Sequence, residues 1–180
     1  SLSISKTVDE IEPMAFLMCP NLESIIVDKN NEAFDSRNDG NALISTDNNT
    51  LMYGCINTII PDSVTAIGLY AFTGCNSLTE VNFSNNVVEI DYLAFAHCEN
   101  LNKVVLPNSL KKMGISAFQY CENITELIIP EGVSEIGDSA FYQCEGIKEI
   151  SIPTSVQRIG ENAFASTGYY DDKTNWEGDL

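Results

Sequence analysis

Hydrophobic positions recur along this chain at a fixed interval, which sets a 23-residue period. Each repeat is marked by a phenylalanine that follows an alanine, and four of the five repeats add a cysteine three positions later. The columns are Ala71, Ala94, Ala117, Ala140 and Ala163, then Phe72, Phe95, Phe118, Phe141 and Phe164, then Cys75, Cys98, Cys121 and Cys144. Such regularity predicts a solenoid, in which each unit stacks on its neighbours.

Each repeat has two halves with different hydrophobic periods. In the first half, as in PEGVSEIGDSAFYQC (130–144), apolar residues lie three and four apart, which predicts a short helical or 3₁₀ segment. In the second half, as in LNKVVL (101–106), they alternate and are rich in Val, which predicts a short strand. A left-handed residue is expected to end each helical turn, two positions after the cysteine column. These positions hold Asn21, Asn100, Asn123 and Gly146.

Strands of successive units are expected to pair in parallel, about 4.8 Å apart, along one side of the molecule. The Ala-Phe-x-x-Cys segments then form the other side, with a core of Val, Ile, Phe and Leu columns between them. The predicted fold class is therefore a leucine-rich-repeat solenoid with 23-residue coils, a parallel β-sheet on one face and short helical or 3₁₀ segments on the other.

One unit departs from the period. The interval from Phe16 to Phe72 is two full periods plus ten further positions. Within this stretch, residues 41–55 carry two apolar runs around an Asp-Asn-Asn turn, which predicts a β-hairpin insertion. The predicted single domain, 1–180, comprises coils 5–27, 28–60 with the hairpin, 61–83, 84–106, 107–129, 130–152 and 153–168, and a tail, 169–180. Because the last coil stops after its first half, we expect the chain to be a piece of a longer protein.

The net charge of the chain argues against two classes of binding partner. The chain has 9 Lys and Arg against 26 Asp and Glu, a formal net charge of −17. This balance argues against nucleic acid, whose phosphates require a basic face, and against anionic lipid surfaces. No apolar stretch of about 18 residues is present, so no transmembrane segment is predicted. Residues 1–14 also lack the basic and apolar regions of a signal peptide.

The unit Ile-Pro-x-Ser-Val-x-x-Ile-Gly-x-x-Ala-Phe-x-x-Cys-x-x-Leu resembles the BspA-like leucine-rich repeats, also called the Treponema pallidum type. The resemblance covers residues 5–168, and residues 41–64 are similar to the irregular hairpin unit of the family. Departures occur at Ser84, Asp91 and Met113, where Pro, Gly and Ile are usual. The resemblance implies a bacterial cell-surface or secreted protein that adheres to macromolecules such as host fibronectin and fibrinogen. It supplies no catalytic residue.

The cysteine column allows a disulfide ladder, a metal site, a reactive thiol or simple packing. Equivalent side chains in stacked coils project in parallel, whereas a disulfide needs converging Cβ atoms. The chain has no Cys-x₂₋₄-Cys pair of the kind that binds zinc. We therefore expect the four column cysteines and Cys19 to behave as small buried hydrophobic residues. Cys55, in the irregular unit, stays open.

Two further candidates for chemistry are weak. His97 is the only histidine, and it stands at a column that holds Gly74, Tyr120 and Gln143 elsewhere, so a solvated side chain is expected rather than a catalytic base. Residues 35–41, DSRNDGN, hint at a calcium loop, but the third position is Arg and the twelfth is Thr. A turn-rich loop is the favoured interpretation. We predict no catalytic residue, no cofactor and no metal site.

The outward positions of the strands are the best candidate site. The period of two places two columns outward on the strand face. The candidate residues are Ile26, Glu80, Asn82, Lys103, Val105, Glu126, Ile128, Glu149 and Ser151. An apolar pair at Val105 and Ile128, bordered by charges, is typical of a protein-binding patch, although β-branched residues also suit strands for their own sake.

These observations predict a non-catalytic, adhesin-like protein-binding module that is extracellular or at the cell surface. The alternative is a structural spacer within a larger surface protein. An open end of the solenoid would also allow end-to-end self-association.

Overall fold

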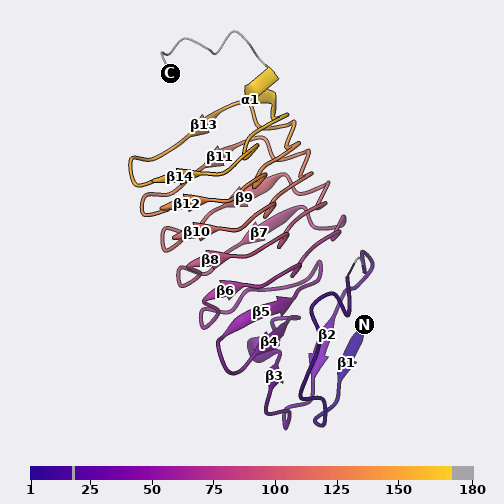
Figure 1. Ribbon diagram of the computed structural model, residues 1–180. Helices are drawn as coiled ribbons and strands as arrows, with labels where there is room; N and C mark the ends of the chain where they lie inside the picture. Colours follow the sequence, from indigo (N-terminus) through magenta and orange to yellow (C-terminus); the bar gives the residue numbers. More distant parts are fainter. Residues whose placement is uncertain (18, 172–180) are drawn as a thin grey trace.

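The computed structural model describes residues 1–17 and 19–171, and it shows successive coils stacked into an elongated solenoid (Figure 1). Within these residues, helical structure is confined to the short η1 (Arg37–Asp39) and α1 (Gly168–Asp171). The repeat solenoid predicted from the regular period is confirmed. Most of the predicted tail, 172–180, lies outside the described residues.

The longest sheet is built from the first half of each repeat. Its parallel strands are β6 (Ala66–Ile67), β8 (Glu89–Ile90), β10 (Lys112–Met113), β12 (Glu135–Ile136) and β14 (Arg158–Ile159). Each residue pairs with the equivalent residue of the next repeat, as Ile67 does with Ile90. Here the structure differs from the helical segment that the sequence predicts, because backbone hydrogen bonds between neighbouring coils hold these residues extended.

The second half of each repeat forms the expected strands on another side of the coil. They are β7 (Glu80–Asn82), β9 (Lys103–Val105), β11 (Leu127–Ile128) and β13 (Ile150–Ser151). β7 pairs in parallel with β9, and β11 pairs in parallel with β13. β9 and β11 belong to different sheets, so the ladder on this face is interrupted between them.

The Ala-Phe-x-x-Cys segments form successive turns. In the four coils that carry the cysteine column, the residue before Ala and the residue before Cys have positive φ, as at Ser116 (55°) and Tyr120 (61°). These reversals point backbone amides along the solenoid axis, so the N–H of Phe118 donates to the carbonyl of Ala140 at 2.8 Å. The left-handed position predicted two residues after the cysteine is therefore wrong. Asn21, Asn100, Asn123 and Gly146 do not adopt it.

Two of these asparagines have another role. The side-chain Nδ2 of Asn100 donates to the carbonyl of Asn76 at 2.8 Å, and that of Asn123 donates to the carbonyl of Glu99 at 2.7 Å. The carboxamide thus fixes each coil to the one before it. These two asparagines therefore serve contacts between coils, not a local backbone conformation.

A continuous stack of phenylalanine rings runs through the main core. The rings of Phe72, Phe95, Phe118, Phe141 and Phe164 lie 4.8, 5.0, 5.3 and 5.5 Å apart between successive centroids and are nearly parallel. This spacing is close to the distance between paired strands, so the rise of the coil sets the distance between the rings. Buried Val, Ile and Leu residues of every coil surround the stack.

The first coil packs differently from the others. β1 (Leu2–Ile4) pairs with β2 (Ile25–Val27), and their buried side chains belong to a cluster separate from the main core. The ring of Phe16 meets Tyr53 edge-on at 5.2 Å instead of joining the phenylalanine stack. In Figure 1 this coil lies beside the irregular unit at the N-terminal end.

The predicted hairpin is confirmed and is extended by a third strand. β3 (Phe34–Asp35), β4 (Leu43–Ser45) and β5 (Thr50–Tyr53) are antiparallel neighbours, and β5 then pairs in parallel with β6. Within β4, Leu43 packs in the N-terminal cluster and Ile44 in the main core. The hairpin therefore joins the two cores.

Among the described residues, no helix has the length and apolar character needed to cross a membrane.

Candidate protein-binding surface

Eight of the nine candidate residues lie on the face formed by β7, β9, β11 and β13, and all eight are exposed. The strands alternate as expected, with Val81, Val104 and Leu127 turned into the core. The strand register sets Glu80 beside Lys103, Asn82 beside Val105, and Ile128 beside Ser151. Ile26 is exposed on β2, in the separate N-terminal sheet, so the structure does not bring it to the other eight.

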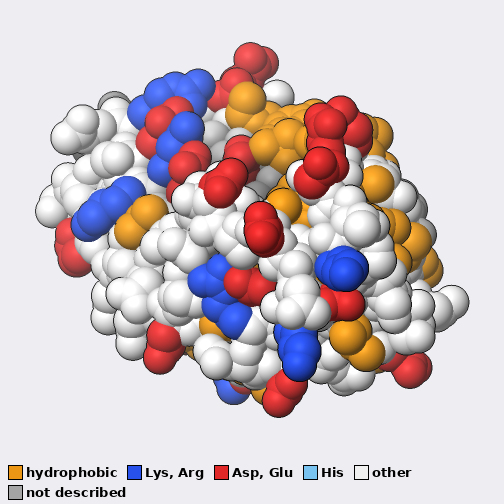
Figure 2. All heavy atoms as spheres, turned by 90° about the horizontal axis from the view of Figure 1, so that it is seen from below, with side chains coloured by type: hydrophobic (Ala, Val, Ile, Leu, Met, Phe, Trp, Pro, Cys, Tyr) orange, Lys and Arg blue, Asp and Glu red, His pale blue; other side chains and the backbone are white. Residues whose placement is uncertain are grey.

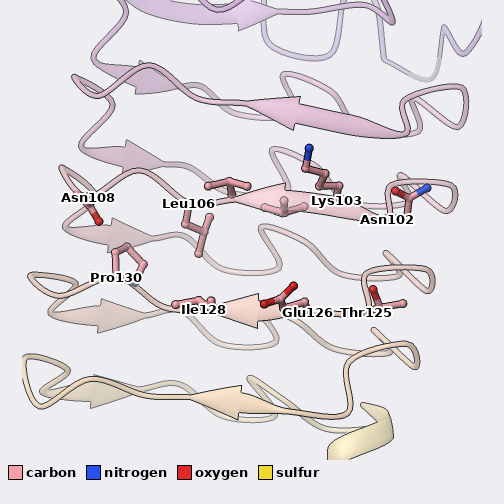
Figure 3. A pocket seen from close by; sticks show the side chains of 10 residues that line it. Asn102, Lys103, Leu106, Asn108, Thr125, Glu126, Ile128 and Pro130 are labelled. Carbon is pink, nitrogen blue, oxygen red and sulfur yellow. The ribbon is translucent and has the colours of Figure 1, made fainter.

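A hollow of about 550 Å³ lies over β9 and β11. Val105 and Ile128 contribute apolar side chains that are 59% and 62% exposed. Lys103 and Glu126 also line the hollow, and Leu106 and Pro130 extend the apolar part (Figure 3). The hollow coincides with the interruption between the two pairs of strands.

The sequence pattern does not single out several residues of the hollow. Leu106 and Pro130 end the strand regions, where the pattern indicates only core and strand-stopping positions. Asn102 and Thr125 occupy one column at its edge and border a second, polar hollow of about 450 Å³ with Asn76 and Asn100. The signal that identifies them is the run of Asn and Thr at equivalent positions of successive repeats.

Charged side chains on this face are only partly paired. The Nζ of Lys103 lies 2.8 Å from Oε1 of Glu80, in the preceding coil. The hydrogen bond from Lys103 lowers the pKa of Glu80 below its usual value. Within the described part of the chain, Glu126 and Glu149 make no ion pair.

The column cysteines are buried and unlinked, as expected of packing residues. Three of the four thiols also donate to a backbone carbonyl of the previous coil, as Cys121 Sγ does to Phe95 at 3.1 Å. Burial raises the pKa of Cys75 and of Cys144 to about 12, so these thiols are poor nucleophiles at neutral pH. The prediction for Cys19 is wrong: it is exposed, because the first coil does not stack in register with the main core. Cys55 is buried.

The remaining candidates carry no catalytic arrangement. His97 is half-buried rather than solvated, and its ring stacks on Tyr120 at 4.5 Å. In the loop 35–41, both carboxylate oxygens of Asp35 accept hydrogen bonds from Nε of Arg37, so this carboxylate is held in an internal ion pair. Among residues 1–17 and 19–171, no three His, Cys, Asp or Glu side chains are grouped to hold a metal.

Parallel-stranded coils of regular length around a phenylalanine stack define a leucine-rich-repeat solenoid. This chain belongs to the family described as BspA type leucine rich repeat region, whose sequence profile matches residues 1–39 and 45–170 in six copies. Comparison with curated proteins gives no significant match.

Solved structures share the fold. A leucine rich cell surface protein from Faecalibacterium prausnitzii is 29% identical, with a TM-score of 0.81, over 92% of this chain and 45% of that one. The Treponema pallidum leucine rich repeat protein is 26% identical, with a TM-score of 0.62, over 68% and 62%. The pneumococcal vaccine antigen PcpA is 22% identical, with a TM-score of 0.78, over 92% and 44%, and supports the fold alone. The chain thus spans less than half the length of two of these proteins.

Proposed function

We propose that this chain is a non-catalytic, adhesin-like protein-binding module of a bacterial protein that is secreted or displayed at the cell surface. The observation that carries the proposal is the apolar hollow at Val105 and Ile128, where both side chains are more than half exposed on an extended sheet face. Exposed apolar groups bordered by charge mark protein-interaction sites. The cell-surface protein of F. prausnitzii, which has the same fold, supports the location.

The proposed ligands are host extracellular matrix proteins, of which fibronectin and fibrinogen are the first to test. This choice follows from the family, whose members are associated with adhesion. An extended sheet face suits such ligands, because solenoids offer long binding surfaces rather than closed pockets.

The test measures binding of the chain to immobilised fibronectin, fibrinogen and collagen by surface plasmon resonance. The Val105→Asp/Ile128→Asp variant should lose saturable binding while keeping its native circular dichroism spectrum. A matched control is Val88→Asp/Ile115→Asp, which changes two aliphatic side chains, 43% and 47% exposed, away from the hollow. If the Val105→Asp/Ile128→Asp variant binds as well as the control variant, the hollow is not part of the binding site. No binding by the native chain would favour a structural spacer.

The same fold offers an edge for end-to-end self-association. In the part of the chain that the structure describes, β14 lies at one edge of the eight-stranded sheet, and its Ile159 is 48% exposed. An unpaired strand edge with an exposed apolar residue is a template for pairing with another chain. Sedimentation velocity over a range of protein concentrations tests this: a single monomeric species throughout would reject it.

A further inference from the structure

Ion pairs on the strand faces follow one rule. Each of three cations, Lys103, Lys112 and Arg158, meets the glutamate at the equivalent position of the preceding repeat. The distances are 2.8 Å to Glu80, 3.5 Å to Glu89 and 2.9 Å to Glu135. In these three pairs, a glutamate in one coil is therefore neutralised by the cation at the same position of the next coil.

Glu126 breaks this rule. The equivalent position of the next repeat holds Glu149, and the register that pairs Leu127 with Ile150 brings the two glutamates to neighbouring positions on the same face. Like charges at neighbouring positions of paired strands repel each other and lower stability. The site thus has two carboxylates and lacks the cation that the other pairs contain.

One of these two glutamates lines the apolar hollow. Glu126 lines the hollow together with Val105 and Ile128, and Glu149 follows in the next coil. Lys103 at the hollow is already bound to Glu80, so it leaves the negative charge of Glu126 uncompensated. Figure 3 shows Glu126 and Ile128 on one coil and Lys103 and Leu106 on the coil before it.

We propose that the segment bound at this hollow is a basic stretch of a protein partner, with a lysine or arginine next to a branched aliphatic or leucine side chain. The cation binds between Glu126 and Glu149 and supplies the missing member of the ion-pair series. The aliphatic side chain enters the hollow between Val105 and Ile128. This inference rests on the proposed function and specifies the chemistry of its partner.

Charge complementarity selects this occupant. The chain carries a formal net charge of −17, which attracts basic segments at long range and repels acidic ones. The two glutamates then give that attraction a fixed place beside apolar surface, which specifies position as well as sign.

The probe is a blocked pentapeptide, Gly-Lys-Leu-Lys-Gly, titrated into the isotope-labelled chain and followed by amide NMR. The matched peptides are Gly-Glu-Leu-Glu-Gly and Gly-Lys-Gly-Lys-Gly. We expect saturable shifts centred on β9, β11 and β13 with the first peptide, no binding of the acidic peptide, and about tenfold weaker binding of the peptide that lacks leucine.

Two double variants test whether the charges of Glu126 and Glu149 bind the basic peptide. Glu126→Gln/Glu149→Gln should weaken binding of the basic peptide about tenfold. Glu122→Gln/Glu145→Gln removes the same charge from exposed positions of the same two coils and should leave binding unchanged. In addition, Glu149→Lys should raise the melting temperature, because it completes the series with a pair at Glu126 of the preceding coil, and should abolish peptide binding.

Shifts spread over the whole acidic surface, or equal weakening by the two double variants, would overturn the inference. The proposed function would still stand after such a result, provided that a matrix protein binds the native chain and the Val105→Asp/Ile128→Asp variant loses that binding. If the basic peptide binds as expected and no matrix protein does, the matrix ligands are wrong and the basic partner stands.

Discussion

Phe118 lies at the centre of the phenylalanine stack and is fully buried. Its ring is parallel to that of Phe95 at 5.0 Å and to that of Phe141 at 5.3 Å. Phe118→Ala should therefore lower the free energy of unfolding by about 3–5 kcal/mol, through lost burial and the cavity left between two rings. Urea denaturation measures the change, and a loss under about 1 kcal/mol would contradict a central core position. Phe164→Ala, at a half-buried ring that stacks on Phe141, is the control and should cost less.

The buried thiols make stability depend on alkaline pH. Burial raises the pKa of Cys144 from 9.0 to about 12, so the folded chain keeps a proton that the unfolded chain loses between these values. Stability is therefore fully present below pH 9.0 and falls as pH rises toward about 12. Urea unfolding at several pH values should show a shallower alkaline decline for Cys144→Ala than for the native chain. Identical slopes would show that this thiol does not titrate as burial predicts.

At the scale of the element, the turns with positive φ decide how each coil is closed. Ser139 has a φ of 55° and donates its N–H to the carbonyl of Glu161 at 2.8 Å. Ser139→Val should cost about 1–2 kcal/mol, because a β-branched residue is strained in this conformation. Ser139→Asn should be nearly neutral, since asparagine tolerates it. Thermal or urea unfolding of the two variants measures the difference, and equal stability would argue against a left-handed residue at this position.

At the scale of the whole molecule, the two hydrophobic cores are expected to open at different free energies. The N-terminal cluster around Ile25 is small and separate from the main core. Local opening follows such divisions, because units with fewer buried contacts open at lower free energy. Hydrogen exchange should therefore be faster at the amide of Asp28, which bonds to Ile4, than at Gly114, which bonds to Ile90. Ile25→Ala should accelerate exchange in the first coil only, and acceleration throughout the chain would show a single cooperative unit.

The repeated sequence pattern predicts much of the architecture. The columns of Ala, Phe and Cys predict the coil length, the buried stack and the outward strand positions, because every coil places equivalent residues in equivalent surroundings. The antiparallel hairpin follows from its turn cluster. In the same way, the alternation in 101–106 predicts that Lys103 and Val105 face outward, as they do.

Other features depend on contacts that a repeat pattern does not contain. Lys103 stands between Glu80 and Glu126 in its column, and only the intact β7–β9 ladder decides that it pairs with Glu80. The interruption between β9 and β11, and hence the hollow at Ile128, is equally a tertiary outcome. Cys19 fits the repeat yet is exposed, since its coil packs against Tyr53 rather than on the next coil in register.

The sequence by itself determined the period, the core columns and the excess of acidic charge, because these are properties of residue type and spacing. Figure 2, seen from below the view of Figure 1, shows acidic and basic side chains interspersed around an exposed apolar area. Only the tertiary structure decided which charges pair, which turns are left-handed and where apolar surface remains open. Those outcomes depend on the stacking of neighbouring coils, whose distances no single repeat specifies.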